Sequence, residues 1–219
     1  MAIDPYYKDA HGELYLGDCL EIMAGMDDKS VDLVLTDPPY GIAYHSCRYK
    51  YGNPHNRIVG DEKQAIPIDA MWKLIAGDGA LFVFYSQKKP LVDARIRNVI
   101  IWVKNNHTAG DLAGDFGNKY EPLAFCPKPD FKLRGKRYSN VWCFDKVPPK
   151  LHPTQKPVSI CRRAIECGAD SGTTVLDPFI GSGTTAVAAK EMGCKYIGID
   201  ISERYLEIAA KRLARGVLF

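Results

Sequence analysis

A strand, a glycine-rich turn and the start of a helix lie close to the carboxyl end of this chain. Residues 174–186 read Thr-Val-Leu-Asp-Pro-Phe-Ile-Gly-Ser-Gly-Thr-Thr-Ala and contain the pattern G-x-G-x-x-A, and Asp200 closes the next apolar run. In nucleotide-binding βαβ units such glycines let the backbone approach a ligand, and an acidic residue about 20 positions further on accepts hydrogen bonds from ribose hydroxyls. The pattern predicts a cofactor that contains adenosine, without identifying it.

The position of this motif constrains the sheet. Only one helix remains after Asp200, so strands from earlier in the chain must complete the sheet. Short apolar runs alternate with helical segments, which is typical of an α/β protein whose mainly parallel sheet carries helices on both faces. We expect seven strands, at 13–16, 31–36, 80–85, 99–103, 122–125, 173–176 and 196–199. We expect helices at 19–26, 66–75, 90–97, 157–167, 184–192 and 203–214.

A second motif, Asp37-Pro38-Pro39-Tyr40, directly follows the apolar run 31–36. Proline has no backbone N–H, fixes φ and favours an extended residue before it, so this strand ends in a carboxylate, carbonyl acceptors and an aromatic ring. That set suits a planar amine that loses hydrogen-bonded protons while it reacts. Ligands bind at the carboxyl ends of parallel strands, where we expect Asp37 to lie beside the nucleotide pocket.

The composition is that of an ordinary globular protein. The chain has 219 residues, 46% hydrophobic and 25% charged, which suits one domain with a full core. Its seven cysteines are scattered without a CxxC pair, which argues against a disulfide framework or a zinc site and favours a reducing cytosol. No segment approaches the length of a membrane span and the amino-terminal residues do not resemble a signal peptide, so we expect no membrane partner and no metal.

The net charge of +3 is unevenly distributed. Residues 127–150 hold seven Lys and Arg against two Asp, a charge of +5, so the rest of the chain sums to −2. Aromatic residues interleave with these charges at Phe131, Tyr138, Trp142 and Phe144. A nucleic-acid surface and a solvated basic loop are equally compatible with this pattern. This segment and residues 41–62 fit neither strand nor helix, and ordered loops of such length are usually functional.

Taken in order, these motifs resemble those of amino-methylating DNA methyltransferases that use S-adenosylmethionine. The order matches the beta arrangement, with the Asp-Pro-Pro-Tyr tetrad first and the cofactor-binding half last. Further matches are Leu16-Gly17-Asp18-Cys19, the segments 102–106 and 120–125, and His-Pro-Thr-Gln-Lys-Pro at 152–157. The resemblance covers nearly the whole chain and implies the Rossmann-like fold of these enzymes.

The resemblance implies roles for the tetrad, whose catalytic members would be Asp37, Pro38, Pro39 and Tyr40. The carboxylate of Asp37 and the main-chain carbonyl of Pro38 would each accept one N–H of the exocyclic amine of adenine, which localises the nitrogen lone pair toward the methyl group. Tyr40 would stack on the base after it leaves the duplex.

The resemblance also implies a set of cofactor contacts. Asp200 would hold the ribose, the segment around Asp18 would border the adenine, and Thr154 and Lys156 would meet the methionine carboxylate. The remaining residues line the methionine portion or flank these positions, and the expected set is Asp18, Cys19, Asp37, Thr154, Lys156, Asp177, Pro178, Phe179, Gly181, Ser182, Gly183, Thr184, Asp200 and Ile201.

In the beta arrangement, the target-recognition region corresponds to 127–150. We therefore expect a single catalytic domain over 1–219, with a short recognition insertion there and a loop at 41–62 that closes over the flipped base or touches the strand. Such a short insertion offers few side chains to read bases, which predicts a short or loosely read recognition sequence. The expected DNA-binding residues are Arg48, Lys50, Arg57, Lys132, Arg134, Lys136 and Arg137.

Several alternatives stay open at the level of the sequence. Cytosine-N4 methylation also attacks an exocyclic amine, although the cytosine-N4 members of the family tend to carry Ser where this chain has Asp37. More distant alternatives are an RNA or protein-amide substrate, a non-catalytic DNA-binding module that retains only the fold, and a nicotinamide oxidoreductase. Because enzymes of this arrangement often pair, a homodimer is a candidate assembly, and the size suits a stand-alone cytoplasmic methylase of a bacterium or phage.

Overall fold

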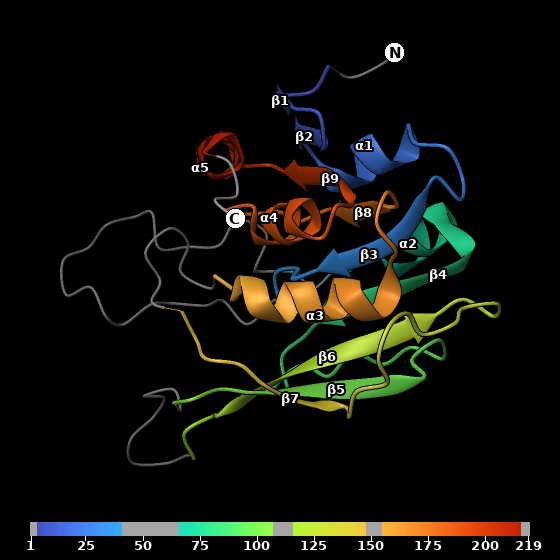
Figure 1. The fold of residues 1–219 in the computed structure, drawn as a ribbon, viewed down its shortest axis with the longest axis vertical. Helices are drawn as coiled ribbons and strands as arrows, with labels where there is room; N and C mark the ends of the chain where they lie inside the picture. Colours follow the sequence, from blue (N-terminus) through green and yellow to red (C-terminus); the bar gives the residue numbers. More distant parts are fainter. Residues whose placement is uncertain (1–3, 41–65, 107–115, 148–154, 216–219) are drawn as a thin grey trace.

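The computed structural model describes residues 4–40, 66–106, 116–147 and 155–215. They form an α/β architecture with one sheet of nine strands in the order β1-β2-β9-β8-β3-β4-β6-β5-β7 (Figure 1). The strands are β1 (Tyr7–Lys8), β2 (Gly12–Leu16), β3 (Val31–Thr36), β4 (Ile75–Phe84), β5 (Asn98–Val103), β6 (Tyr120–Pro127), β7 (Val141–Cys143), β8 (Thr174–Asp177) and β9 (Lys195–Asp200). The helices are α1 (Cys19–Ala24), α2 (Ile68–Leu74), α3 (Val158–Gly168), α4 (Thr184–Glu191) and α5 (Glu203–Ala214).

The expectation of a mainly parallel sheet is confirmed. Five strand pairs are parallel, and three are antiparallel, namely β1–β2, β4–β6 and β5–β6. The expected count of seven strands is wrong, because β1 and β7 add one strand at each edge. These two strands have only two and three residues, which is too short for a hydrophobic pattern to reveal them.

The helix expected at 90–97 is absent, since the structure forms turns there. Asp93 explains the difference: its Oδ1 accepts hydrogen bonds from the backbone N of Arg95 at 2.9 Å and from the Nε of Arg95 at 2.7 Å. A short acidic side chain that bonds its own neighbouring backbone competes with helix formation. The helix expected at 66–75 is shorter, because β4 already begins at Ile75.

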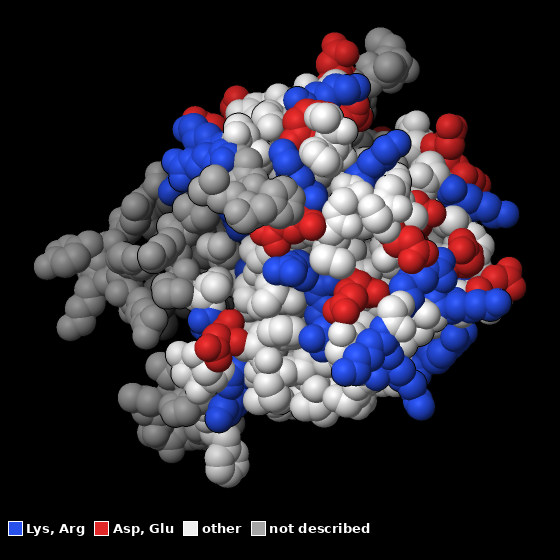
Figure 2. Space-filling model, in the orientation of Figure 1, with Lys and Arg blue, Asp and Glu red and all other residues white. Residues whose placement is uncertain are grey.

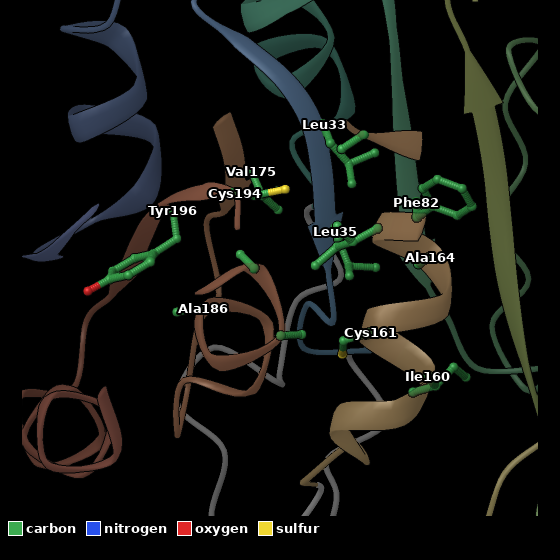
Figure 3. Packing of buried hydrophobic residues seen from close by; sticks show 14 of the residues in the cluster. Leu33, Leu35, Phe82, Ile160, Cys161, Ala164, Val175, Ala186, Cys194 and Tyr196 are labelled. Carbon is green, nitrogen blue, oxygen red and sulfur yellow. The ribbon is translucent and has the colours of Figure 1, made fainter. Parts of the chain in front are cut away.

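Two hydrophobic layers cover the sheet, one on each face. Along β3, Leu33 and Leu35 belong to the cluster that packs against α3, α4 and α5, whereas Val34 belongs to the cluster beneath α1 and α2. Figure 3 shows Leu33 and Leu35 beside residues of α3 such as Ala164. Successive side chains of a strand point to opposite faces, so the continuous apolar runs of β3 and β4 serve both layers.

Candidate active site

The ends of β3 and β8 bring two aspartates together. β3 and β8 are parallel neighbours, with Leu33 opposite Val175 and Val34 opposite Leu176. Thr36, the last residue of β3, donates a hydrogen bond from Oγ1 to Oδ1 of Asp177 at 2.8 Å. Burial raises the pKa of Asp177 to about 7, and the nearby Asp37 carboxylate adds to this rise. Asp37 and Asp177 therefore lie at one edge of the sheet, as the strand pattern predicts.

Two side chains donate to the carboxylate of Asp37. The hydroxyl of Tyr40 donates to Oδ1 at 2.5 Å, and the ammonium of Lys156 donates to Oδ2 at 2.5 Å. Burial raises the pKa of Asp37, while the positive charge of Lys156 acts in the opposite direction. The catalytic tetrad expected from the sequence thus includes a carboxylate that is held on both oxygens by the chain itself.

Lys156 is part of a row of alternating charges that sequence analysis did not identify. Its Nζ lies 3.2 Å from Oε2 of Glu121, and the other oxygen of Glu121 accepts a hydrogen bond from Lys104. Lys156 and Lys104 are both buried. Glu121 comes second in β6, a strand otherwise rich in apolar residues, and its charge marks the position as unusual but does not indicate its partner.

The glycine-rich turn between β8 and α4 is tied to the end of β9. The backbone N–H of Gly181 donates to Oδ2 of Asp200 at 2.9 Å, and the N–H of Ser202 donates to Oδ1 at 2.8 Å. Gly183 has φ +83°, and a Cβ there would lie 2.7 Å from the Cβ of Ala209 on α5. Glycine is required at this position because its side chain must be absent and its φ is left-handed.

Helix α5 also holds the turn from outside. The guanidinium of Arg212 donates to the carbonyl of Ser182 at 2.5 Å and lies 3.2 Å from Oγ1 of Thr184. Ser182 and Thr184 are buried, so this contact fixes the segment that leads into α4. The turn is therefore held by a carboxylate on one side and by an arginine on the other.

The surface beside Asp200 is apolar. Leu16 lies opposite Asp200 in the β2–β9 pairing, Ile201 follows Asp200, and Leu20 lies in the first turn of α1. Their exposed fractions are 40%, 57% and 51%, respectively. A carboxylate beside exposed aliphatic side chains is the combination that a nucleoside needs, with acceptors for the ribose and an apolar surface for the base.

Comparison with known proteins places the chain in a family. A family model described as DNA methylase matches residues 31–211. The chain belongs to the family of DNA N6/N4 amino-methyltransferases. It is 30% identical over 247 residues to the type II methyltransferase M2.DpnII of Streptococcus pneumoniae, covering 95% of this chain and 92% of that protein. It is 31% identical over 205 residues to the putative methylase YubD of Escherichia coli, covering 90% and 88%.

Solved methyltransferase structures share the fold of this DNA methylase. The complex of M1.HpyAVI with S-adenosylmethionine has a TM-score of 0.67 at 23% identity and covers 92% of this chain and 99% of that chain. The PvuII DNA methyltransferase, described as cytosine-N4-specific, has a TM-score of 0.74 at 17% identity and covers 95% and 88%. The Rossmann-like fold implied by the sequence motifs is confirmed.

The residues of the DNA methylase fit S-adenosylmethionine, the cofactor of this family. Asp200 and the apolar surface around it suit adenosine, and Phe179 and Gly181 lie in the turn between β8 and α4. Asp18 caps α1, accepting from the N–H of Leu20 at 2.7 Å, and burial raises the pKa of the neighbouring Cys19 to about 11. Thr154 lies outside the described residues, and Lys156 contacts Asp37.

The connection from β6 to β7, residues 128–140, lies at the opposite end of the strands from Asp37, whereas β7, parallel to β5, brings Lys146 back to the end where Asp37 lies. β6 is antiparallel to β4, so Pro127 pairs with Ala80 at the start of the β4 core, and the N–H of Lys128 donates to Gly79 at 2.9 Å. Figure 1 shows the connection from β6 to β7 away from the end of β3, and Figure 2 shows basic side chains gathered on that side.

Some side chains of this segment contact the protein, whereas Lys132, Lys136 and Arg137 are exposed. Arg134 forms ion pairs with Asp78 at 3.0 Å and Asp170 at 2.9 Å. The ring of Tyr138 lies 3.6 Å from the guanidinium of Arg163 on α3, and Trp142 is buried. The structure therefore does not bring Lys132, Arg134, Lys136 and Arg137 to the candidate site, and Arg48, Lys50 and Arg57 lie outside the described residues.

None of the helices in the described residues has the length and apolar character needed to cross a bilayer. In the same parts of the chain, His, Cys, Asp and Glu form no group of three or more that could hold a metal ion.

Proposed function

We propose that this DNA methylase transfers the methyl group of S-adenosylmethionine to the N6 amine of adenine in DNA, after the base leaves the duplex. The observation that carries the proposal is the Asp37 carboxylate at the carboxyl end of β3, at the same sheet edge as the glycine-rich turn. This juxtaposition puts an acceptor for amine protons beside the surface that suits the cofactor.

The role proposed for Asp37 as a hydrogen-bond acceptor follows from the electronic structure of the amine. The lone pair of an exocyclic amine is delocalised into the ring, so the nitrogen is a poor nucleophile. A carboxylate oxygen of Asp37 and the carbonyl of Pro38 each accept one N–H, which favours a tetrahedral nitrogen with a localised lone pair. These hydrogen bonds strengthen as the nitrogen gains positive charge, and interactions that strengthen in the transition state raise the rate.

The remaining groups bind and orient. When bound, S-adenosylmethionine supplies an electrophilic methyl group on a positively charged sulfur. Asp200 has each oxygen occupied by one backbone N–H, so lone pairs remain for ribose hydroxyls. Tyr40 is tethered to Asp37 by its hydroxyl, so its ring lies beside the carboxylate, where it can stack on the flipped base.

Two observations favour adenine over cytosine. The tetrad begins with Asp37, whereas the cytosine-N4 members that it resembles tend to begin with Ser. A relative from Escherichia coli that is 26% identical over 247 residues is named DNA adenine methyltransferase YhdJ. Cytosine-N4 transfer is the second candidate, because it also needs an acceptor for the protons of an exocyclic amine. The fold neighbour PvuII methyltransferase is described as cytosine-N4-specific.

The direct test incubates the protein with DNA and S-adenosylmethionine carrying a labelled methyl group, then digests the DNA and separates the nucleosides. We expect label in N6-methyldeoxyadenosine, and none with Asp37→Ala. Label in N4-methyldeoxycytidine would overturn the assignment of the base. No label in either nucleoside, from protein that still binds the cofactor, would overturn the assignment as an enzyme.

The proposal includes a single catalytic domain with a recognition insertion at 127–150 and a loop at 41–62. It also includes a short or loosely read recognition sequence, a homodimer and a cytoplasmic location. The recognition sequence has a simple test. A methylation map of treated DNA that showed one long, strictly read site would contradict the loose specificity.

A further inference from the structure

Lys156 lies where a cation has no role in the chemistry proposed so far. Its ammonium donates to Oδ2 of Asp37 at 2.5 Å and approaches Oε2 of Glu121 at 3.2 Å. The side chain of Lys156 is only 7% exposed. A lysine that served the cofactor carboxylate would have its donors available for it, whereas here the carboxylates of Asp37 and Glu121 and, at 3.4 Å, the Tyr40 hydroxyl surround the ammonium.

The surroundings of the ammonium hold it in place. The aromatic rings of Phe84 and Tyr40 have centroids 4.9 and 5.7 Å from the Nζ atom, within the range of cation–π attraction. Lys156 directly precedes Pro157, the N-cap residue of α3, so its backbone is anchored by the helix. The ammonium is therefore fixed in position and sheltered from water.

The charges in this cluster balance. Asp37 and Glu121 carry two negative charges, and Lys156 and Lys104 carry two positive charges, with Lys104 paired to the far oxygen of Glu121. Buried charges are stable only when they are paired and hydrogen-bonded, so each member depends on its neighbour. Glu121 holds Lys156, and Lys156 in turn holds Asp37.

Asp37 needs such a partner for the reaction. A buried carboxylate tends to take up a proton, and a protonated carboxyl has an O–H donor in place of an acceptor. Burial and the charge of Glu121 both raise the pKa of Asp37, and Lys156 opposes both effects. The hydroxyl of Tyr40 also donates to Asp37 and lowers its pKa, but it is neutral. Lys104 is paired with Glu121, and Asp177 and the buried Cys161 are not cations. Lys156 is therefore the cation that contacts Asp37 within the described residues.

We propose that Lys156, anchored by Glu121, is a positioning residue that keeps the Asp37 carboxylate ionised and correctly oriented for the incoming amine. This inference rests on the proposed function, because it assigns Asp37 the role of acceptor. It gives Lys156 a different task from the one that its sequence motif implies, namely binding of the methionine carboxylate.

The first measurement is independent of activity. The carboxyl group of Asp37 is titrated by NMR in protein with 13C-labelled aspartate, its signal being assigned by its loss in Asp37→Asn. We expect Lys156→Met to raise the pKa of Asp37 by about 1 to 3, the effect of removing an adjacent opposite charge. Glu121→Gln is expected to lower this pKa, because a neighbouring negative charge is lost. Opposite signs from two neighbouring positions are not expected from a loss of packing.

The second measurement uses the pH dependence of methyl transfer. With Lys156→Met we expect a fall in kcat of about 100-fold or more near neutral pH and an acid limb displaced to higher pH, with the KM for S-adenosylmethionine changed less than about threefold. Lys156→Arg keeps the charge and is expected to restore much of kcat. Lys190→Met is the matched control, since Lys190 forms a comparable ion pair with Asp9 at 2.7 Å elsewhere.

Three results for Lys156→Met would each overturn the inference. The first is an unchanged pKa of Asp37, the second is a raised KM for S-adenosylmethionine with kcat intact, and the third is a loss of kcat that is equal at every pH. If Lys156→Met fails to fold, Lys156→Gln is titrated in its place, and an unchanged pKa of Asp37 in that variant overturns the inference. If the wild-type protein transfers no methyl group to DNA, the proposed function fails, but the NMR titration still decides whether Lys156 controls the ionisation of Asp37.

Discussion

At the scale of single residues, the two aspartates at the ends of β3 and β8 have contrasting surroundings. Asp37 has a cationic partner in Lys156, whereas Asp177 accepts from the neutral hydroxyl of Thr36 at 2.8 Å and the N–H of Phe179 at 3.0 Å. Neutral donors stabilise a carboxylate less than a cation does. Burial raises the pKa of both acids, but only Asp37 has a cationic partner that opposes this rise.

This contrast predicts a pH-dependent stability. Burial raises the pKa of Asp177 to about 7 in the folded protein, above its ordinary value of 3.8. The folded state therefore binds this proton more tightly than the unfolded state, and the contribution of Asp177 to stability falls as pH rises from about 4 to about 7. Asp177→Asn keeps the Oδ1 acceptor without the charge. We expect it to gain about 1 kcal/mol or more relative to wild type between pH 5 and pH 8, in denaturant unfolding of both proteins.

A difference between the two proteins that stays constant over this pH range would contradict the raised pKa. The comparison is made without added cofactor, so that binding does not contribute to the measured stability.

The sequence allowed prediction of some residues of the site but not others. Asp37 and Asp177 could be placed together, because each ends an apolar run and parallel strands align their ends. Glu121 could not be placed at the site, because it comes at the start of β6. It lies beside the carboxyl ends of β3 and β4 only because β6 runs antiparallel to β4. Strand direction is not visible in a hydrophobic pattern, so the partner of Lys156 could not be foreseen.

At the scale of elements, the turn between β8 and α4 depends on its glycines and on α5. Gly183 and Gly172 share a left-handed φ, +83° and +87°, but only Gly183 is crowded, since a Cβ at Gly172 would meet no other atom within 4 Å. The strand–turn–helix motif was predictable from the sequence, because the glycines mark it. Its contact with α5 was not, because it joins segments that are distant in the chain.

This pair of glycines gives a matched test of the turn. Gly172→Ala is expected to cost about 1 kcal/mol of unfolding free energy, from the left-handed backbone alone. Gly183→Ala is expected to cost about 1 to 3 kcal/mol more, because its Cβ meets Ala209 at 2.7 Å. It should also weaken S-adenosylmethionine binding, measured by isothermal titration calorimetry, whereas Gly172→Ala should not. Equal losses of stability for both variants would show that α5 does not constrain the turn.

At the scale of the whole molecule, the direction of β6 decides where charge lies relative to the site. The basic excess at 127–150 was visible in the sequence, but the placement of residues 128–140 at the far edge was not, because the antiparallel β6 carries the chain away from Asp37 before β7 returns it. The site edge has lysines of its own, Lys88 after β4 and Lys119 before β6. DNA that delivers a base to Asp37 must approach this edge.

We therefore expect the two sets of cations to differ in DNA binding. Replacing Lys88 and Lys119 by Gln should weaken binding and reduce the slope of log K against log salt by about 1 to 2, as expected for one or two lost phosphate contacts. Replacing Lys132 and Lys136 by Gln removes the same charge from the far edge and should change the affinity less than about threefold. Fluorescence anisotropy over a range of salt concentrations measures the affinity for DNA and its salt dependence. A larger effect of the Lys132 and Lys136 variant would instead support DNA binding by the segment 127–150.

The central claim, that the Asp37 carboxylate accepts protons of the target amine during methyl transfer, is tested most directly by single-turnover methylation of DNA with wild-type protein and Asp37→Asn. The variant keeps the size and one oxygen acceptor but loses the charge. We expect its rate constant for transfer to fall by about 100-fold or more, while its affinity for S-adenosylmethionine stays within about threefold of wild type. A rate constant within about tenfold of wild type, at unchanged affinity, would contradict the account.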